Sequence, residues 1–171
     1  MNSKEVDTTR RRRFDRVVSI YYKDMYRYAA WLCRDPSVAE VVVQESMLRA
    51  WKALDSLRDD GAAKHWLLTI VRRENGRYFA GAKPEMLDID DLTPRQNEMI
   101  STTDDPDLEE MRQAIYTLED DYREPLVLQV LMGYSTEEIA AMLGIKRGAV
   151  LTRLYRARRK LKETIYEAAA A

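Results

Sequence analysis

The chain of 171 residues is long enough for one or two small domains, and its 46% of apolar residues can form ordinary hydrophobic cores. No apolar run approaches the roughly 20 residues of a membrane-spanning helix, and the N-terminus is polar and Arg-rich, so we expect a cytoplasmic protein without membrane insertion. One cysteine, Cys33, and one histidine, His65, exclude an internal disulfide and nearly exclude a Cys/His zinc site, and we expect neither a metal nor another cofactor.

The net charge of −1 conceals a strong segregation of charge along the sequence. The first 80 residues carry a net charge of +5, the next 30 carry −8, and the remainder carry +2. The acidic stretch also holds three of the five prolines, which is typical of an extended linker. We therefore predict two small helical domains, over residues 10–80 and 109–167, joined by an acidic flexible linker over residues 81–108.

The first domain reads as helical throughout. Residues 13–33 predict an amphipathic helix, because apolar side chains recur at three- and four-residue steps. Asp35 and Pro36 provide an N-cap and a first-turn proline for a second helix, which continues to about Ser56. After a short break, a third helix is expected over residues 63–78. No alternating pattern typical of strands occurs, so the predicted fold class is all-α.

The segment from Gly133 to Lys162 predicts a helix-turn-helix. Ser135 and Glu138 have the spacing of a capping box, and Gly144 ends the helix that they begin. The second helix is strongly basic, with eight Lys or Arg residues and no acid from Gly144 to Lys162, so its exposed face suits phosphates. Its predicted buried side consists of Val150, Leu154, Ala157 and Leu161. This pattern favours DNA binding.

Three segments together carry the pattern of a known family. They read SVAEVVVQESMLRAW (residues 37–51), LDSLRDDGAAKHWLLTIVRR (54–73) and LEDDYREPLVLQVLMGYSTEEIAAMLGIKRGAVLTRLYRARRKL (118–161). In this combination and order the chain resembles a bacterial sigma factor of the extracytoplasmic-function (ECF) group. The resemblance implies a subunit that is no enzyme. It implies binding to core RNA polymerase and promoter DNA for transcription initiation, and inhibition by an anti-sigma factor.

The resemblance implies that the second helix docks on the clamp helices of the polymerase β′ subunit, while the β flap provides a further contact. Family members commonly carry acids at the positions of Val38 and Val41, so residues 38–43 here form an unusually apolar band. We expect a more hydrophobic polymerase contact or a protein partner on this band. The residues that match the polymerase-binding surface are Val41, Gln44, Glu45, Arg49 and Trp51.

The loop over residues 57–64 and the helix after it match the region that captures the promoter −10 element. An unstacked base needs a pocket there, with cations beside it for the single-strand backbone. Trp66 is expected to pack in the core, and the preferred base stays open because Ala62 and Ala63 replace common aromatic residues. The implied −10 contacts are Arg58, Asp60, Gly61, Lys64, Arg72, Arg73 and Arg77.

The second helix of the helix-turn-helix is expected to read the duplex −35 element in the major groove. The main departure from the family is Leu151, where Lys or Arg is usual. A leucine cannot donate a hydrogen bond to guanine, but it can contact a thymine methyl group. The implied −35 contacts are Arg147, Gly148, Ala149, Leu151, Thr152, Arg153, Tyr155, Arg156 and Arg158.

Two alternatives remain on the sequence alone. A one-component repressor or activator would also contain a helix-turn-helix, but it would bind a palindrome without polymerase. An enzyme would need the linker acids as metal ligands, yet these lie in a Pro-interrupted segment without a nucleophile–base pair or a phosphate-binding loop. The acids in question are Asp88, Asp90, Asp91, Asp104, Asp105 and Asp107.

Overall fold

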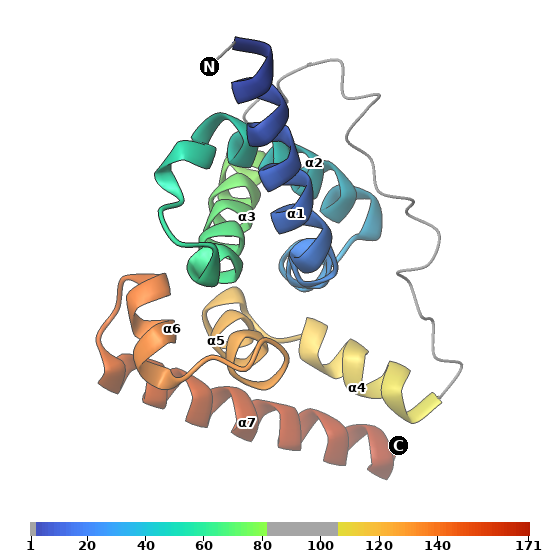
Figure 1. Cartoon of the computed structure of the whole chain (residues 1–171). Coiled ribbons are helices and arrows are strands. Elements are labelled where there is room, and N and C mark those ends of the chain that lie inside the picture. The colour runs from blue at the N-terminus through green and yellow to red at the C-terminus, as the bar shows by residue number, and fades with distance from the viewer. Residues whose placement is uncertain (1–2, 82–105) are drawn as a thin grey trace. The chain divides into compact units, whose positions relative to one another are not determined.

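The computed structural model describes residues 3–81 and 106–171, which belong to two compact units (Figure 1). Over these described ranges the chain is helical and contains no strand, which confirms the predicted all-α class. Most of the predicted acidic linker lies outside the described residues. Within the described residues, no helix is long and apolar enough to cross a membrane.

The first unit is a three-helix assembly in which each long helix contacts the other two. Its core contains Phe14 and Met25 from the first helix, Met47 from the second and Leu67 from the third, all buried. The elements are α1 (Ser3–Cys33), α2 (Pro36–Ala53), the short 3₁₀ turns η1 (Leu54–Ser56) and η2 (Asp60–Ala62), and α3 (Ala63–Phe79). These four residues lie on the predicted apolar sides of their helices.

Helix α1 begins well before the predicted amphipathic segment. Residues 4–9 are exposed, so no apolar periodicity marks this end of the helix. The hydroxyls of Thr8 and Thr9 donate to the carbonyls of Lys4 and Glu5, one helical turn back. The start of α2 follows the sequence signal, because the Asp35 carboxylate accepts hydrogen bonds from the first-turn backbone N–H groups. Its end lies at Ala53, earlier than the predicted Ser56, because the chain continues there as the 3₁₀ turn η1.

The only cysteine, Cys33, closes α1 and is buried. Its Sγ lies 3.2 Å from the side-chain oxygen of Asn75 on α3. Burial, with a smaller contribution from Asp35, raises the pKa of this thiol to about 12. At neutral pH the thiol is therefore protonated and packs as a small apolar group.

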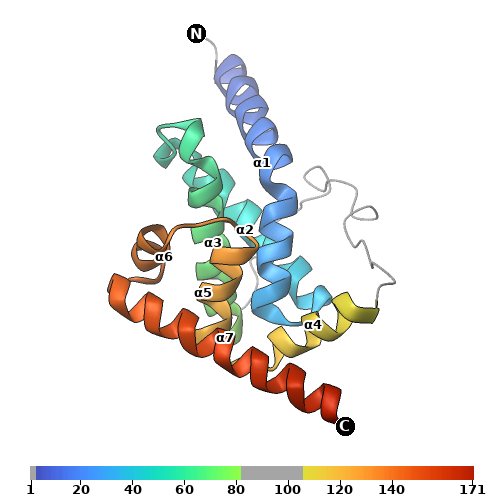
Figure 2. The ribbon, with the colours of Figure 1, turned by 90° about the horizontal axis from the view of Figure 1, so that it is seen from below.

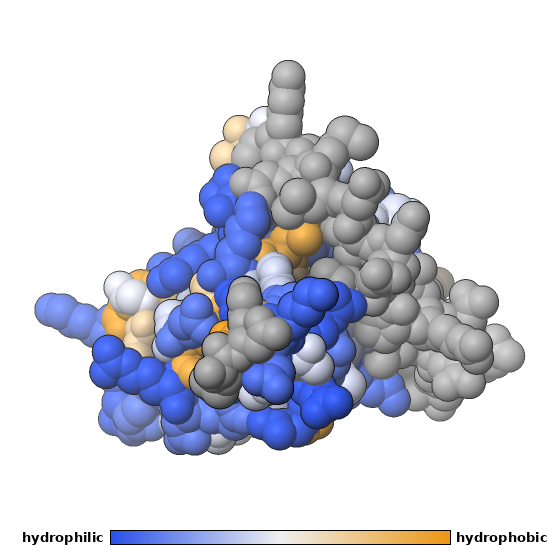
Figure 3. Space-filling view, turned by 45° about the horizontal axis from the view of Figure 1, so that its top comes forward, coloured by the Kyte–Doolittle hydropathy of each residue, from blue (hydrophilic) through white to orange (hydrophobic). Residues whose placement is uncertain are grey.

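The second unit is built along one long helix, α7, against which three shorter helices pack (Figure 2). The elements are α4 (Pro106–Tyr116), α5 (Asp120–Val130), α6 (Thr136–Leu143) and α7 (Arg147–Ala170). Val150, Leu154 and Ala157 of α7 are buried, together with Ile139 of α6. In the face drawn in Figure 3, the described residues are mainly hydrophilic and hydrophobic ones form only small groups.

Helices α6 and α7 form the predicted helix-turn-helix. The Ser135 hydroxyl accepts from the Glu138 backbone N–H, and the Glu138 carboxylate accepts from the Ser135 N–H in return, which completes the capping box. Gly144 ends α6 with φ of 66°, a left-handed conformation that favours glycine. The predicted capping and turn residues therefore have their expected roles.

A buried arginine was missed by the sequence analysis. Arg123 of α5 is only 2% exposed, and its guanidinium donates to the Leu118 carbonyl at 2.7 Å and to the Asp120 carboxylate. These contacts hold the connection between α4 and α5, because they satisfy a carbonyl that has left the helix. A buried charge needs such partners, and no pattern in the sequence indicates which acceptors lie near this guanidinium.

Candidate nucleic-acid interface

The exposed face of α7 has a neutral centre. Opposite the buried side of the helix lie Gly148, Leu151, Thr152 and Tyr155, none of which is charged. Leu151 is 44% exposed and Tyr155 is 68% exposed. The Thr152 hydroxyl donates to the Gly148 carbonyl at 3.0 Å. This centre therefore presents methyl groups and a phenol ring to whatever meets the helix.

Arginines flank this neutral centre, and three of them contact acceptors on neighbouring helices. Arg147 pairs with Glu137 at 2.6 Å, Arg153 with Asp121 at 3.4 Å, and Arg158 donates to the side-chain oxygen of Gln129. These contacts are exposed or partly exposed, and exposed ion pairs contribute only about 0–1 kcal/mol each. A phosphate could therefore replace the carboxylate partners at little cost.

Two further groups near α7 have shifted pKa values. Hydrogen bonds from its own backbone N–H and from the Thr136 hydroxyl lower the pKa of Glu137, and Arg147 adds a smaller effect. Lys160 donates to Glu119 at 2.8 Å, which raises the pKa of Lys160. Both groups are consequently charged at neutral pH.

All nine predicted −35 contacts lie on the N-terminal half of α7. Ala149 and Arg153 are partly exposed. The other seven are exposed: Arg147, Gly148, Leu151, Thr152, Tyr155, Arg156 and Arg158. Within the described residues, Arg156 has no carboxylate partner. Together the nine residues present neutral groups that can contact base edges and cations that can contact phosphates.

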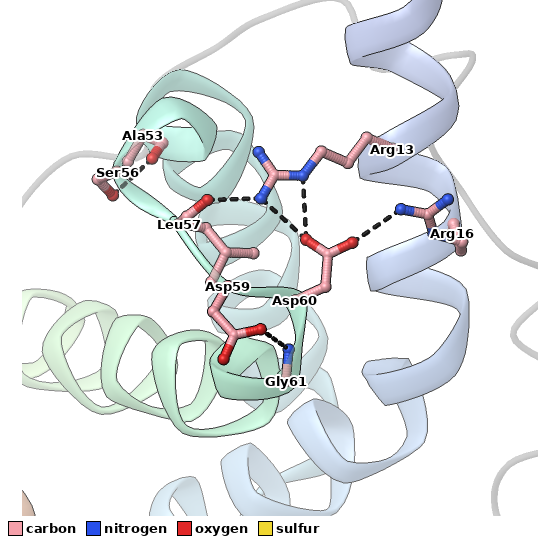
Figure 4. Close-up of polar contacts among 8 residues, drawn as sticks. All are labelled: Arg13, Arg16, Ala53, Ser56, Leu57, Asp59, Asp60 and Gly61. Atoms are coloured by element: carbon pink, nitrogen blue, oxygen red, sulfur yellow. Dashed lines mark hydrogen bonds and ion pairs between the residues drawn. The ribbon is translucent and has the colours of Figure 1, made fainter.

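The loop between α2 and α3 is held to α1 by arginines (Figure 4). Arg13 donates to one Asp60 oxygen at 3.0 and 2.8 Å, and Arg16 donates to the other oxygen at 2.7 Å. The Arg13 guanidinium also donates to the Leu57 carbonyl. Hydrogen bonds from Arg13 and then Arg16 lower the pKa of the Asp60 carboxyl.

Two of the predicted base-contacting groups in this loop are thus engaged within the protein. Both Asp60 oxygens accept from α1, and the Gly61 N–H donates to the Asp59 carboxylate at 2.9 Å. These arginine partners were not predicted, because they lie more than 40 positions away in the sequence. The other predicted −10 residues fall into two groups: Arg58, Arg73 and Arg77 are exposed, and Lys64 and Arg72 are partly exposed.

A buried glutamate connects the predicted polymerase surface with the predicted −10 surface. Glu74 of α3 is 8% exposed and lies 3.2 Å from Arg49 of α2 and 3.8 Å from Arg77. The sequence analysis missed Glu74. Its position could have been found, since it follows Leu67 and Val71 at the spacing of the buried face of α3.

The apolar band on α2 is narrower in the structure than expected. Val42 and Val43 are core residues, while Val38 and Val41 are partly exposed. Trp51 contacts the edge of the Phe14 ring at 5.3 Å between centroids. All five predicted polymerase contacts are partly exposed: Val41, Gln44, Glu45, Arg49 and Trp51.

Trp66 does not lie wholly in the core. It is partly exposed, and its indole N–H donates to the Ser56 hydroxyl at 3.2 Å.

A helix-turn-helix with a basic second helix, in a chain that also has a separate helical unit, is typical of a DNA-binding transcription regulator. Residues 17–84 match the family Sigma-70 region 2, and residues 108–161 match Sigma-70, region 4. The ECF RNA polymerase sigma-E factor of Escherichia coli K12 is 34% identical over 137 residues, covering 72% of each chain. The ECF sigma factor SigM of Bacillus subtilis is 29% identical over 151 residues, covering 86% of this chain and 92% of that one. The chain belongs to the ECF sigma factors of RNA polymerase.

Solved structures share this fold. The sigma factor RpoE in complex with the anti-sigma factor NepR, from Bartonella quintana, matches with a TM-score of 0.65 and 27% identity, covering 90% of this chain and 96% of that one. CnrH, in complex with the cytosolic domain of CnrY, matches with a TM-score of 0.66 and 24% identity over 92% of this chain and 90% of that one, a likeness of fold alone.

Proposed function

We propose that this sigma factor acts in the cytoplasm, catalyses no reaction itself, and selects promoters by two DNA contacts whose spacing core polymerase fixes. The observation that carries this proposal is the exposed face of α7, a neutral strip between arginines on the second helix of a helix-turn-helix. Such a face meets base edges at its centre and phosphates at its margins. The family of the chain supplies the context in which that contact selects a promoter.

We assign the −35 element to the N-terminal half of α7 and the −10 element to the loop between α2 and α3 with the adjoining face of α3. The partly exposed residues of α2 would bind the β′ clamp helices, and the second unit would contact the β flap. The predicted domain boundaries belong to the same proposal. We further propose that the acidic linker passes through the active-site cleft of the polymerase. An acidic chain suits a channel built for nucleic acid.

We also propose that an anti-sigma factor holds the chain inactive. The support is that RpoE of Bartonella quintana, whose fold this chain shares, was solved in complex with one. The partly exposed Val38 and Val41 provide an apolar surface that a protein partner could cover. Binding there would compete with core polymerase.

The test is gel filtration of the chain with bacterial core RNA polymerase, followed by transcription of a promoter library by the complex. We expect co-elution and transcripts that begin at a shared upstream sequence. The control is a chain with Gln44 and Glu45 replaced by Ala, which should elute apart from core polymerase. No association of the unmodified chain, together with tight binding to a palindromic duplex, would instead support a one-component repressor.

A further inference from the structure

Three arginines on one face of α1 reach the segment that joins α2 to α3. Arg10, Arg13 and Arg16 follow one another at three-residue steps, so they lie along one side of the helix. Arg10 donates to the Trp51 carbonyl at 2.6 Å, and its guanidinium lies 4.5 Å from the centre of the Trp51 ring. The other two meet Asp60, so the whole row faces the end of α2 and the loop beyond it.

Arg13 holds both ends of the short stretch that belongs to no helix. Residues 57–59 lie between η1 and η2. The guanidinium of Arg13 contacts the Leu57 carbonyl at one end and the Asp60 carboxylate at the other (Figure 4). The Leu57 side chain is buried, and Asp59 bonds back to the Gly61 N–H. This stretch of surface backbone is therefore fixed by side chains far away in the sequence.

The charges of Arg13, Arg16 and Asp60 make it possible to distinguish a positioning role from direct electrostatic attraction of DNA. Two guanidinium groups surround one carboxylate, so removing the Asp60 charge would make the loop more positive. Simple attraction to phosphates would then become stronger. If Asp60 instead orders the loop, its removal would weaken binding, because a disordered loop must be ordered when DNA binds.

We propose that Arg13, Arg16 and Asp60 are positioning residues for the loop that captures the −10 single strand. They act by holding residues 57–60 in place, and they need not touch DNA. This inference rests on the proposed role of the loop in −10 binding, and it replaces the base contact expected of Asp60 from the sequence.

The first experiment compares Asp60→Asn with the unmodified chain in complex with core polymerase. The probe is a fluorescent forked DNA whose single-stranded −10 segment has been enriched from a random library by the unmodified holoenzyme. We expect Asp60→Asn to bind this probe about five- to tenfold more weakly, the effect of losing one charge-assisted contact. Affinity for core polymerase and for a fully duplex −35 probe should not change.

Asp15→Asn is the matched control. It removes the same charge from an exposed carboxylate of α1 that pairs with Arg11 at 3.3 Å, away from the loop. It should bind the forked probe as the unmodified chain does, or slightly more tightly. Thermal unfolding of both variants would show whether any loss of binding merely follows a loss of folded protein.

A second variant, Arg13→Lys, keeps the positive charge but removes the planar guanidinium group with its several N–H donors. A lysine has a single ammonium group and cannot bond the Leu57 carbonyl and Asp60 in the same geometry. We expect it to lose affinity for the forked probe as Asp60→Asn does, although its net charge is unchanged.

Two outcomes would overturn the proposal. Equal or tighter binding of the forked probe by Asp60→Asn would contradict the positioning role alone, and the −10 assignment would stand. If the unmodified holoenzyme enriches no −10 sequence, both the −10 assignment and the positioning role fail.

Discussion

At the scale of single residues, Leu151 stands where the family resemblance leads us to expect Lys or Arg. It is exposed at the centre of the α7 face, and the cations lie to either side of it. Apolar contact with a thymine methyl is the base contact open to such a side chain in the major groove. The identity of one base pair in the −35 element should therefore depend on this residue.

Replacing that thymine by uracil removes only the methyl group. We expect the holoenzyme to bind the uracil duplex about fourfold more weakly, because burial of one methyl group contributes about 0.8 kcal/mol. Leu151→Ala should bind both duplexes alike, and Leu151→Lys should shift the preference toward guanine. Fluorescence anisotropy with the paired duplexes measures this. An undiminished methyl effect in Leu151→Ala would exclude Leu151 as the reader.

The Asp60 carboxyl should titrate below its ordinary pKa of 3.8, because Arg13 and Arg16 stabilise the charged form. A group with a lowered folded-state pKa contributes stability above its unfolded pKa, and this contribution is lost as the pH falls through the folded value. We therefore expect the contribution to be constant from neutral pH to about pH 5, to decline as the pH falls further, and to be lost only below the folded-state pKa, which lies under 3.8. Carbon-detected NMR titration should show the pKa rising in Arg13→Gln. An unchanged value would contradict the hydrogen bonds from Arg13.

At the scale of elements, the ends of helices were predictable where capping needs a particular side chain at a fixed spacing. Asp35 before α2 and the pair Ser135 and Glu138 at α6 are such cases. The early start of α1 was not predictable, because its first turns are exposed and carry no apolar pattern. The contacts of Arg13 were also beyond sequence reasoning, since its partner Asp60 lies 47 positions away. The burial of Glu74 could have been predicted from the apolar spacing of α3, but its contact with Arg49 of α2 could not.

The helix-turn-helix should depend on its cap and on its turn. We expect Ser135→Ala to destabilise the second unit by about 1 kcal/mol through the lost cap. Gly144→Ala should cost about 1–2 kcal/mol, because φ is 66° there. The control is Gly148→Ala, where an added Cβ meets nothing within 4 Å and φ is not left-handed, so stability should not fall. Urea unfolding followed by circular dichroism measures all three. A stable Gly144→Ala variant would contradict the turn geometry.

At the scale of the whole molecule, the charge is divided between two helical units and the acidic stretch between them. On the proposed function, each unit would offer a modest DNA contact of its own. Because one chain joins the two units, the second contact would form at a high effective concentration once the first has formed. On this proposal, selection of a promoter would be a property of both units together.

Cutting the chain tests this dependence. A protease site placed within residues 82–105 should leave both units helical after cleavage. Promoter-specific binding in the presence of core polymerase should fall on the order of 100-fold, because the second contact is no longer intramolecular. The same protein before cleavage is the control. A cleaved chain that selects promoters as well as the intact one would show that core polymerase alone supplies the coupling.

The burial of Cys33 has a practical consequence for such experiments. A thiol with a pKa of about 12 is almost entirely protonated at neutral pH. Maleimide and disulfide reagents should therefore not react with it while α1 and α3 stay packed. Cysteines introduced at exposed positions, one in each unit, could therefore be labelled with fluorophores without first removing the native residue. Energy transfer between the two dyes would then report how the units move when polymerase, promoter DNA or an inhibitory partner binds.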